Sequence, residues 1–239
     1  MTIPVILLGP GGNVIDMVDM IEDINRAHGP RYELLGFLDN RAEAVGRSFE
    51  GYPVLGPYAE APMLAGRFPD AHFSTWLGGT NSYWRRPEVI GHLGIPAERF
   101  VTLVHPSSYV SRRAHLGRGV IIFQNCTIAN NVTLGDHVVV LPQTVVSHDD
   151  KIGDYTAITG GVVLAGNVTV EPSCYLGTNC SIHHGITIGR GSLIGMGSVV
   201  LHDVPPFQVM MGNPARRLRD ATRPADPEAG MTRGVGEER

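Results

Sequence analysis

Aliphatic residues recur at every sixth position from Val104 to Val200, and all seventeen positions of this series are Val, Leu or Ile. Three residues after each of them, Gly, Asn or Asp predominates, and these residues tolerate the left-handed backbone of a sharp corner. Four residues after each, the side chain is usually small or β-branched. The period predicts short strands joined by corners, with three hexads forming one coil of a triangular parallel β-helix.

The first hundred residues follow a different pattern. "PVILLG" is a short apolar strand, and Val14, Val18 and Ile21 after it have helical spacing. "YELLGFLDN" and "DAHFSTWLGG" are two further strand candidates. Strands that alternate with helices indicate a small Rossmann-like parallel sheet.

The predicted fold class is therefore α/β plus all-β, with a small Rossmann-like parallel sheet domain followed by a left-handed parallel β-helix. We expect a Rossmann-like domain over residues 1–103 and the β-helix over residues 104–219. Residues 220–239 are rich in Pro, Gly and charge and are expected to form a flexible tail.

Charge and composition exclude several classes of partner. The net charge is −4 and the isoelectric point is about 6.2, so there is no basic field for nucleic acid. No apolar run approaches the roughly 20 residues of a membrane span, and "MTIPVILLGPGG" lacks the positive start of a signal peptide. We expect a cytoplasmic protein. Its three cysteines all occupy the small inward position of the repeat, as core residues: Cys126, Cys174 and Cys180.

The first strand leads into a glycine turn that resembles a degraded dinucleotide fingerprint. Gly9 and Gly11 fit its start, but Val14 replaces the third glycine. The backbone donors of Gly11, Gly12 and Asn13 at a helix N-terminus could hold a pyrophosphate, and a plain tight turn is the alternative.

The segment "VVSHDDKIGDY" brings three titratable side chains into the aliphatic repeat. One coil is 18 residues, so His148, Gly166 and His184 are expected to stack along one edge about 5 Å apart. The imidazole of His148 could act as a general base, and the N–H of Gly166 could donate to an oxyanion. This combination predicts an acyl-transfer site.

The two aspartates beside His148 are not equivalent. Asp149 could orient the imidazole, but it also sits in the corner position, where Asp is an ordinary residue. Asp150 occupies the small inward position, where a carboxylate is costly unless it is hydrogen-bonded or protonated. The sequence leaves the role of Asp150 open.

The other histidines do not predict a metal site. Adjacent His183 and His184 raise the question of zinc, but such a site needs three converging ligands and the spacing offers none. A position near the cofactor or an ordinary exposed corner is expected for His184. His115 and His137 have no stacked partner and are predicted to lie on the surface.

The hexads and the closing segment "GSVVLHDVPPFQVMMGNPARRL" resemble the left-handed β-helix acyltransferases. The order "VILLGPGGN", "GFLDN", "WLGGTN", "HPSSYVS", "SHDDKIGDY" and "LAGNV" resembles the bacterial sugar acetyltransferases with an N-terminal nucleotide-sugar domain. The sialic acid O-acetyltransferase type is a near relative of these enzymes. The resemblance spans about residues 3–219.

The resemblance implies a homotrimer with acetyl-CoA as cosubstrate in the groove between neighbouring β-helices. It makes His148 the base, Asp149 its acidic neighbour and Gly166 the donor to the thioester carbonyl, with His184 near the cofactor. Arg216 and Arg217 fall where the closing segment approaches the CoA phosphates. Six residues match the region that holds the nucleotide of the sugar substrate: Gly11, Gly12, Asn13, Asp39, Asn40 and Gly78.

The expected activity is acetyl-CoA-dependent N-acetylation of a nucleotide-linked amino sugar. O-acetylation of a sugar hydroxyl is the first alternative, and a metal-dependent hydratase of the γ-carbonic-anhydrase type or a non-catalytic trimeric scaffold are alternatives of other classes. Members of the family often have a histidine where this chain has Asn13 and a glycine where it has Val14. Some relatives have a second histidine where this chain has Ala157. All three departures concern the substrate side, so they bear on the acceptor rather than the chemistry.

Overall fold

The computed structural model describes residues 2–9 and 12–221 and confirms the predicted fold class. Its N-terminal part is a five-stranded sheet in the order β3-β4-β2-β1-β5, parallel except for the β3–β4 hairpin. The hairpin and α2 were not predicted. The strands are β1 (Ile3–Leu8), β2 (Tyr32–Leu38), β3 (Ser48–Phe49), β4 (Tyr52–Gly56) and β5 (His72–Thr75). The helices are α1 (Gly12–His28), α2 (Ala61–Arg67) and α3 (Arg86–Gly91), with 3₁₀ turns at Ala42–Ala44, Tyr58–Glu60, Tyr83–Arg85 and Ala97–Arg99.

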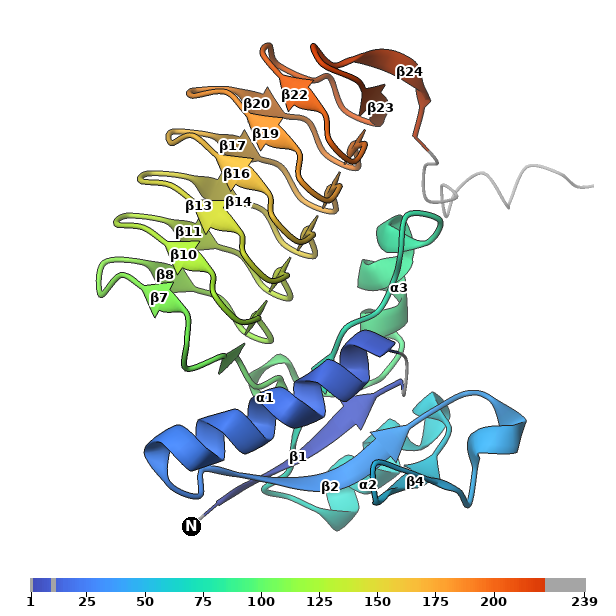
Figure 1. Ribbon diagram of the computed structural model, residues 1–239. Coiled ribbons are helices and arrows are strands. Elements are labelled where there is room, and N and C mark those ends of the chain that lie inside the picture. The colour runs from blue at the N-terminus through green and yellow to red at the C-terminus, as the bar shows by residue number, and fades with distance from the viewer. Residues whose placement is uncertain (1, 10–11, 222–239) are drawn as a thin grey trace, which may run out of the picture.

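The hexads form a β-helix whose three faces are parallel sheets of two-residue strands (Figure 1). One face, which we name the docked face, contains β6 (Leu103–Val104), β9 (Ile121–Ile122), β12 (Val139–Val140), β15 (Ala157–Ile158), β18 (Tyr175–Leu176) and β21 (Leu193–Ile194). The uncharged face contains β7 (Tyr109–Val110), β10 (Thr127–Ile128), β13 (Val145–Val146), β16 (Val163–Leu164), β19 (Ser181–Ile182) and β22 (Val199–Val200). The third face contains β8 (His115–Leu116), β11 (Thr133–Leu134), β14 (Lys151–Ile152), β17 (Thr169–Val170) and β20 (Thr187–Ile188).

The register of the coils is the one that the period predicts. Val146 pairs with Ile128 in the coil before it and with Leu164 in the coil after it, so residues 18 apart lie above one another. The aliphatic member of each strand points inward, and the corners are left-handed, as at Asp149 with φ 61°. All three cysteines are buried, and burial raises the pKa of each thiol, which agrees with an inert role in the core.

The three faces differ in what covers them. On the docked face, Ile121 and Val139 lie in one hydrophobic cluster with Val14 and Val18 of α1. Figure 1 shows α1 between the N-terminal sheet and the base of the β-helix. On the uncharged face, the outward residues carry no charge and several are exposed, among them Tyr109 and Val163. This face is left without a covering layer in the single chain.

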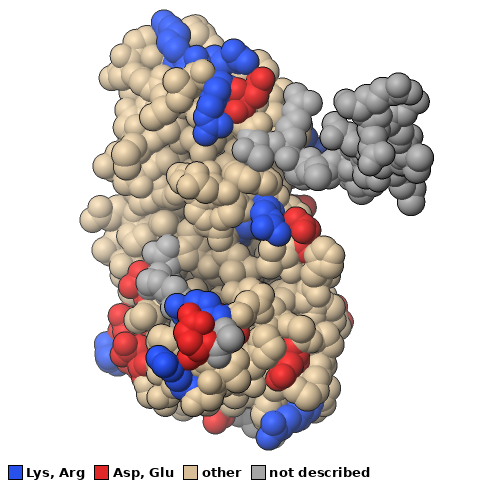
Figure 2. Space-filling model, turned by 90° about the vertical axis from the view of Figure 1, so that its right-hand side faces the viewer, with Lys and Arg blue, Asp and Glu red and all other residues tan. Residues whose placement is uncertain are grey.

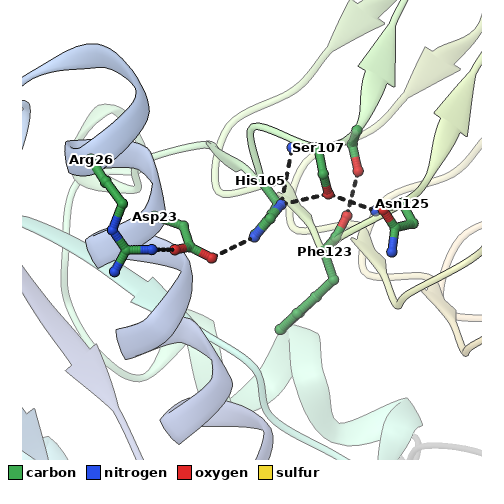
Figure 3. A network of polar contacts seen from close by, with 7 residues as sticks. Asp23, Arg26, His105, Ser107, Phe123 and Asn125 are labelled. Atoms are coloured by element: carbon green, nitrogen blue, oxygen red, sulfur yellow. Dashed lines mark hydrogen bonds and ion pairs between the residues drawn. The ribbon is translucent and has the colours of Figure 1, made fainter.

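A polar network also joins the two parts of the chain (Figure 3). The carboxylate of Asp23 on α1 lies 3.0 Å from Nε2 of His105, and Nδ1 of His105 lies 2.8 Å from the hydroxyl of Ser107. The Ser107 hydroxyl in turn accepts from the backbone N–H of Asn125 in the next coil. Helix α1 is thus tied to the first corner of the β-helix by polar contacts as well as by its apolar side.

His137 is buried, and the prediction that it lies on the surface was wrong. Its ring stacks on Tyr155 and meets Phe100 edge-on. Arg86 of α3 reaches over this edge and donates to the carbonyls of His137 and Tyr155 at 2.7 and 2.8 Å. A corner residue is exposed on an isolated β-helix, but here the N-terminal part covers it.

The end of the fold also differs from the prediction. The last strands are β23 (Gln208–Met211) and β24 (Arg216–Asp220), which pair antiparallel and close the β-helix. Asp220 was expected in the tail but ends β24, and Ala221 is buried, so a tail would begin later than predicted. The rest of the predicted tail, 222–239, lies outside the described residues.

Candidate active site

His148, Gly166 and His184 stack along the edge between the uncharged face and the third face, as predicted. The carbonyl of His148 accepts from the N–H of Asn167, and that of Gly166 accepts from the N–H of Gly185, so the three corners are in register. The rings of His148 and His184 have centroids 6.4 Å apart. The glycine between them leaves a space without a side chain.

Asp149 holds the imidazole of His148. Its Oδ2 lies 2.8 Å from Nδ1 of His148, and its Oδ1 accepts from the side-chain amide of Asn131 at 3.1 Å. The hydrogen bonds from His148 and then Asn131 lower the pKa of Asp149. An ionised Asp149 makes Nδ1 the protonated nitrogen of His148, which leaves the lone pair on Nε2. Sequence reasoning missed Asn131, although it lies one coil before Asp149 and the period of 18 residues could have identified it.

Gly166 places its bare backbone against the free nitrogen of that ring. A Cβ added at Gly166 would lie 2.9 Å from Nε2 of His148, closer than real contacts allow. Gly166 has φ +99° and Asn167 has φ 53°, and this is the one corner of the described β-helix where two successive residues have positive φ. Both the space and the conformation therefore require glycine.

Asp150 is fully buried beneath this corner. Its Oδ1 accepts from the backbone N–H of Val168 at 2.8 Å. Its Oδ2 is also buried and has no hydrogen-bond partner among the described residues. Burial raises the pKa of Asp150 to about 6, and the N–H groups of Val168 and Ser147 oppose this shift.

The arginines predicted to meet CoA lie at the far end of the β-helix. Arg216 and Arg217 are exposed on β24, and Arg217 bonds to Asp220 and Gln208. Figure 2 shows basic side chains gathered at this end, while most of the visible β-helix surface below them is uncharged. Their distance from His148 along the stack leaves their role a prediction.

A cavity lies in the N-terminal part, at the carboxyl ends of β1, β2 and β5. In the sheet, β1 lies between β2 and β5, so the chain continues from β1 to the strand on one side and later returns to the other side. Open α/β sheets bind ligands at such a point, where the strand order switches direction. The cavity has a volume of about 310 Å³ and is lined by residues that include Asn40, Tyr58, Gly78, Ser82 and Arg86. Two of the six predicted substrate residues, Asn40 and Gly78, thus line one cavity.

The other four predicted substrate residues are Gly11, Gly12, Asn13 and Asp39. Asp39 is buried; burial raises its pKa, but hydrogen bonds from Arg41 outweigh this and leave the pKa below its usual value. Gly12 and Asn13 begin α1, and Gly11 lies outside the described residues.

No group of three or more His, Cys, Asp or Glu side chains in residues 2–9 and 12–221 is arranged to hold a metal ion. Across the same residues, no helix has the length and apolar character that a membrane span needs.

Residues 167–202 match the family described as bacterial transferase hexapeptide (six repeats). No curated protein sequence matches the chain well enough to be counted as a relative.

Solved structures match over most of the chain. The acetyltransferase domain of PglB from Neisseria gonorrhoeae, also solved with acetyl coenzyme A, has 25% identity and a TM-score of 0.78, with 91% of this chain and 100% of that chain covered. PerB from Caulobacter crescentus, solved with CoA and GDP-perosamine, has 27% identity and a TM-score of 0.74, with 90% and 97% covered. WeeI from Acinetobacter baumannii, at 19% identity and a TM-score of 0.57, shares the fold. This chain is an acyltransferase with a left-handed β-helix of hexapeptide repeats, as the matched repeat and the acetyltransferase structures at 25% and 27% identity support.

Proposed function

We propose that this protein transfers the acetyl group of acetyl-CoA to the amino group of a nucleotide-linked amino sugar, with His148 as general base. The observation that carries the proposal is the arrangement of His148, Asp149 and Gly166, in which an oriented imidazole faces a backbone without a side chain. The relatives solved with acetyl-CoA, or with CoA and a nucleotide-linked sugar, support both substrate classes.

The reaction needs one proton acceptor and one oxyanion donor. Nε2 of His148 takes a proton from the sugar amine as its nitrogen attacks the thioester carbonyl carbon. The N–H of Gly166 donates to the carbonyl oxygen as it becomes negative, which lowers the barrier most in a site that excludes water. The C–N bond forms, the C–S bond breaks, and the CoA sulfur leaves with the proton that His148 received.

The cavity of the N-terminal part is the proposed nucleotide site. It opens at the switch point of a parallel sheet, and Asn40 and Gly78 are among the residues that line it. Arg85 also lines it, is exposed with its Nε 3.6 Å from Glu88, and has the positive charge that suits a diphosphate.

The base and this cavity lie on different edges of the β-helix. Segment 83–86 packs along the edge that contains His137, Tyr155 and Gly191, whereas His148 occupies the edge beside the uncharged face. A second copy on the uncharged face would approach His148 with its own cavity. We therefore propose a homotrimer in which each active site combines two chains.

The test is a thiol-release assay with acetyl-CoA and UDP-, GDP-, TDP- and CMP-linked sugars, each offered as the amino sugar and as its hydroxyl counterpart. One amino sugar should support turnover, and His148→Ala should lower kcat by about 10²–10⁴-fold while the protein stays folded. His115→Ala is the matched control, because His115 is exposed on the third face away from the stack.

Full turnover by His148→Ala would contradict the assignment of the base. Turnover with the hydroxyl sugars alone would instead favour O-acetylation by the same groups.

A further inference from the structure

Polar side chains at the inward position of the repeat form one recurring contact. Six of these side chains donate to the carbonyl of the residue 15 positions later, in the coil above. The six contacts are Thr102 to Gly117 at 2.8 Å, Ser108 to Phe123 at 2.6 Å, Cys126 to Leu141 at 3.2 Å, Thr144 to Thr159 at 3.1 Å, Thr156 to Glu171 at 3.3 Å and Cys174 to Gly189 at 3.3 Å.

Thr102, Ser108 and Thr156 also make a second contact to the same corner. Their hydroxyls accept from the N–H of the residue 18 positions later, which is Val120, Cys126 and Cys174 in turn. One side chain thus bridges the carbonyl that enters a corner and the N–H that leaves it. The bridge needs a group that accepts and donates at once.

Asp150 makes only the accepting half of this bridge. Its Oδ1 accepts from the N–H of Val168, 18 residues later, while Oδ2 stays buried without a partner among the described residues. The residue 15 positions after Asp150 is Ala165. The carbonyl of Ala165 belongs to the same peptide unit as the N–H of Gly166, the proposed oxyanion donor.

The orientation of this peptide unit has to be fixed by a contact from another residue. Glycine at φ +99° is weakly restricted by its own backbone, so Gly166 does not by itself fix the direction of its N–H. An oxyanion donor is effective only when its direction is set before the reaction.

We propose that Asp150 is a positioning residue that holds a proton on Oδ2 and donates it in a hydrogen bond to the Ala165 carbonyl. The acid form completes the two-contact bridge, satisfies the buried oxygen and fixes the Ala165–Gly166 peptide with its N–H turned toward the acyl donor. This inference rests on the proposed function, because the peptide matters to catalysis only if acyl transfer occurs there.

The surroundings of Asp150 favour the acid form. The inward positions directly below and above it are Val132 and Val168, both buried and apolar. Burial raises the pKa of Asp150 to about 6; among its titratable neighbours, His148 lowers this pKa and Asp149 raises it. An acyl donor and a neighbouring chain that cover this edge would remove more water and raise the pKa further.

Three variants separate the proposal from a purely structural role. Asp150→Asn and Asp150→Thr each keep one donor and one acceptor, whereas Asp150→Val keeps neither and matches Val132 and Val168. We expect kcat of the Asn and Thr variants to stay within about threefold of wild type, and kcat of the Val variant to fall about 10- to 100-fold. The KM for acetyl-CoA should change by less than about threefold in all three, because no contact to CoA is removed.

The dependence of kcat on pH distinguishes a positioning role from a purely structural one, because a change in stability alone would not alter it. The kcat of the wild type should decline as the pH rises through the pKa of Asp150, and this limb should be absent from the Asn and Thr variants. An Asp150→Asn variant as inactive as Asp150→Val would overturn the proposal in favour of an ionised carboxylate, and an unchanged Asp150→Val would overturn any positioning role.

A measurement without turnover keeps this test separate from the proposed function. The carboxyl carbon of Asp150, assigned by its loss in Asp150→Asn, should titrate in ¹³C NMR near pH 6, and at higher pH when CoA is added. A carboxyl group that titrates near the usual value of about 4 would refute the proton on Oδ2 even in an active enzyme. A protein without acetyl-transfer activity but with the raised titration would refute the proposed function and leave the bridge in place.

Discussion

The proposed active site depends on His148 and Gly166, which share one small space. Nε2 of His148 faces the position where any other residue at 166 would have its Cβ, 2.9 Å away. Asp149 and Asn131 hold the ring from the opposite side through Nδ1. A side chain at 166 would therefore act on the base directly, since the ring cannot move back without breaking its hydrogen bond to Asp149.

Gly166→Ala is predicted to lower kcat by about 100-fold or more, because the new methyl group displaces the base and the peptide that donates to the oxyanion. The left-handed backbone at φ +99° should also cost about 1–2 kcal/mol of unfolding free energy. Turnover and urea unfolding measure the two effects.

Gly185→Ala is the matched control. Gly185 lies in the next corner of the same edge with φ +73°, but nothing lies within 4 Å of an added Cβ. It should lose a similar free energy of unfolding and keep kcat within about threefold. If both variants lost the same activity, backbone strain rather than the contact with His148 would explain the loss.

Some of these residues could be predicted from the sequence and others could not. The period of 18 residues is enough to place His148, Gly166 and His184 in one stack, because the coils have no insertion. The burial of His137 could not be predicted, since it depends on Arg86 and Phe100 from a part of the chain outside the repeat. The bridge proposed for Asp150 depends on distances within the corners, and the period of the sequence does not supply these distances.

At the scale of elements, α3 packs against the edge of the β-helix that contains His137, and Arg86 makes the contact. Arg86 is fully buried, and burial lowers its pKa to about 9. It donates to the carbonyls of His137 and Tyr155, while burial and then the charge of Arg86 lower the pKa of His137 to about 4. A neutral His137 beside a cationic Arg86 is the arrangement that this contact requires.

The stability of the docked α3 should therefore depend on pH through His137. The folded pKa of about 4 lies below the unfolded value of 6.5, so protonation favours the unfolded chain. The stabilising contribution is fully present above pH 6.5 and is lost as the pH falls toward 4. The loss should amount to about 3 kcal/mol, measured as the difference in unfolding free energy between wild type and His137→Asn.

His137→Asn suits this comparison because asparagine tolerates the left-handed φ of 58° and does not titrate. Asp150 titrates in the same window with the opposite sign, but it is present in both proteins and cancels in the difference. Parallel stability curves of the two proteins between pH 7 and 4 would contradict the role given to His137.

At the scale of the whole molecule, the predicted two-part fold followed from two distinct periods. The hexads define the β-helix because each aliphatic residue must point inward, and the alternation of strand and helix defines the sheet. The short hairpin of β3 and β4 carries no comparable period: Ser48–Phe49 and Tyr52–Gly56 are too brief for alternation to be distinguished from a loop. The docking of the two parts depends on side chains such as Tyr83, whose hydroxyl donates to the Gly191 carbonyl, and no local pattern reports such contacts.

The distribution of surfaces leads to the last prediction, which concerns the active site proposed to be shared between chains. His148 borders the uncharged face, while the cavity with Asn40 and Gly78 lies with α3 on another edge. Two inactive variants test whether these parts come from different chains: His148→Ala removes the base, and Val89→Trp fills the cavity that Val89 lines. Each should be inactive alone.

Chains of both kinds, co-expressed in equal amounts with different tags and purified together, should recover about one quarter of the wild-type activity, because one chain pairing in four joins an intact cavity to an intact His148. Separately assembled proteins that are mixed without subunit exchange provide the baseline and should stay inactive. If the co-expressed chains also stayed inactive while forming mixed oligomers, the base and the cavity would have to act within one chain. The β-helix would then need a substrate long enough to reach from the edge of His137 to the edge of His148, which a compact amino sugar on a diphosphate is poorly suited to do.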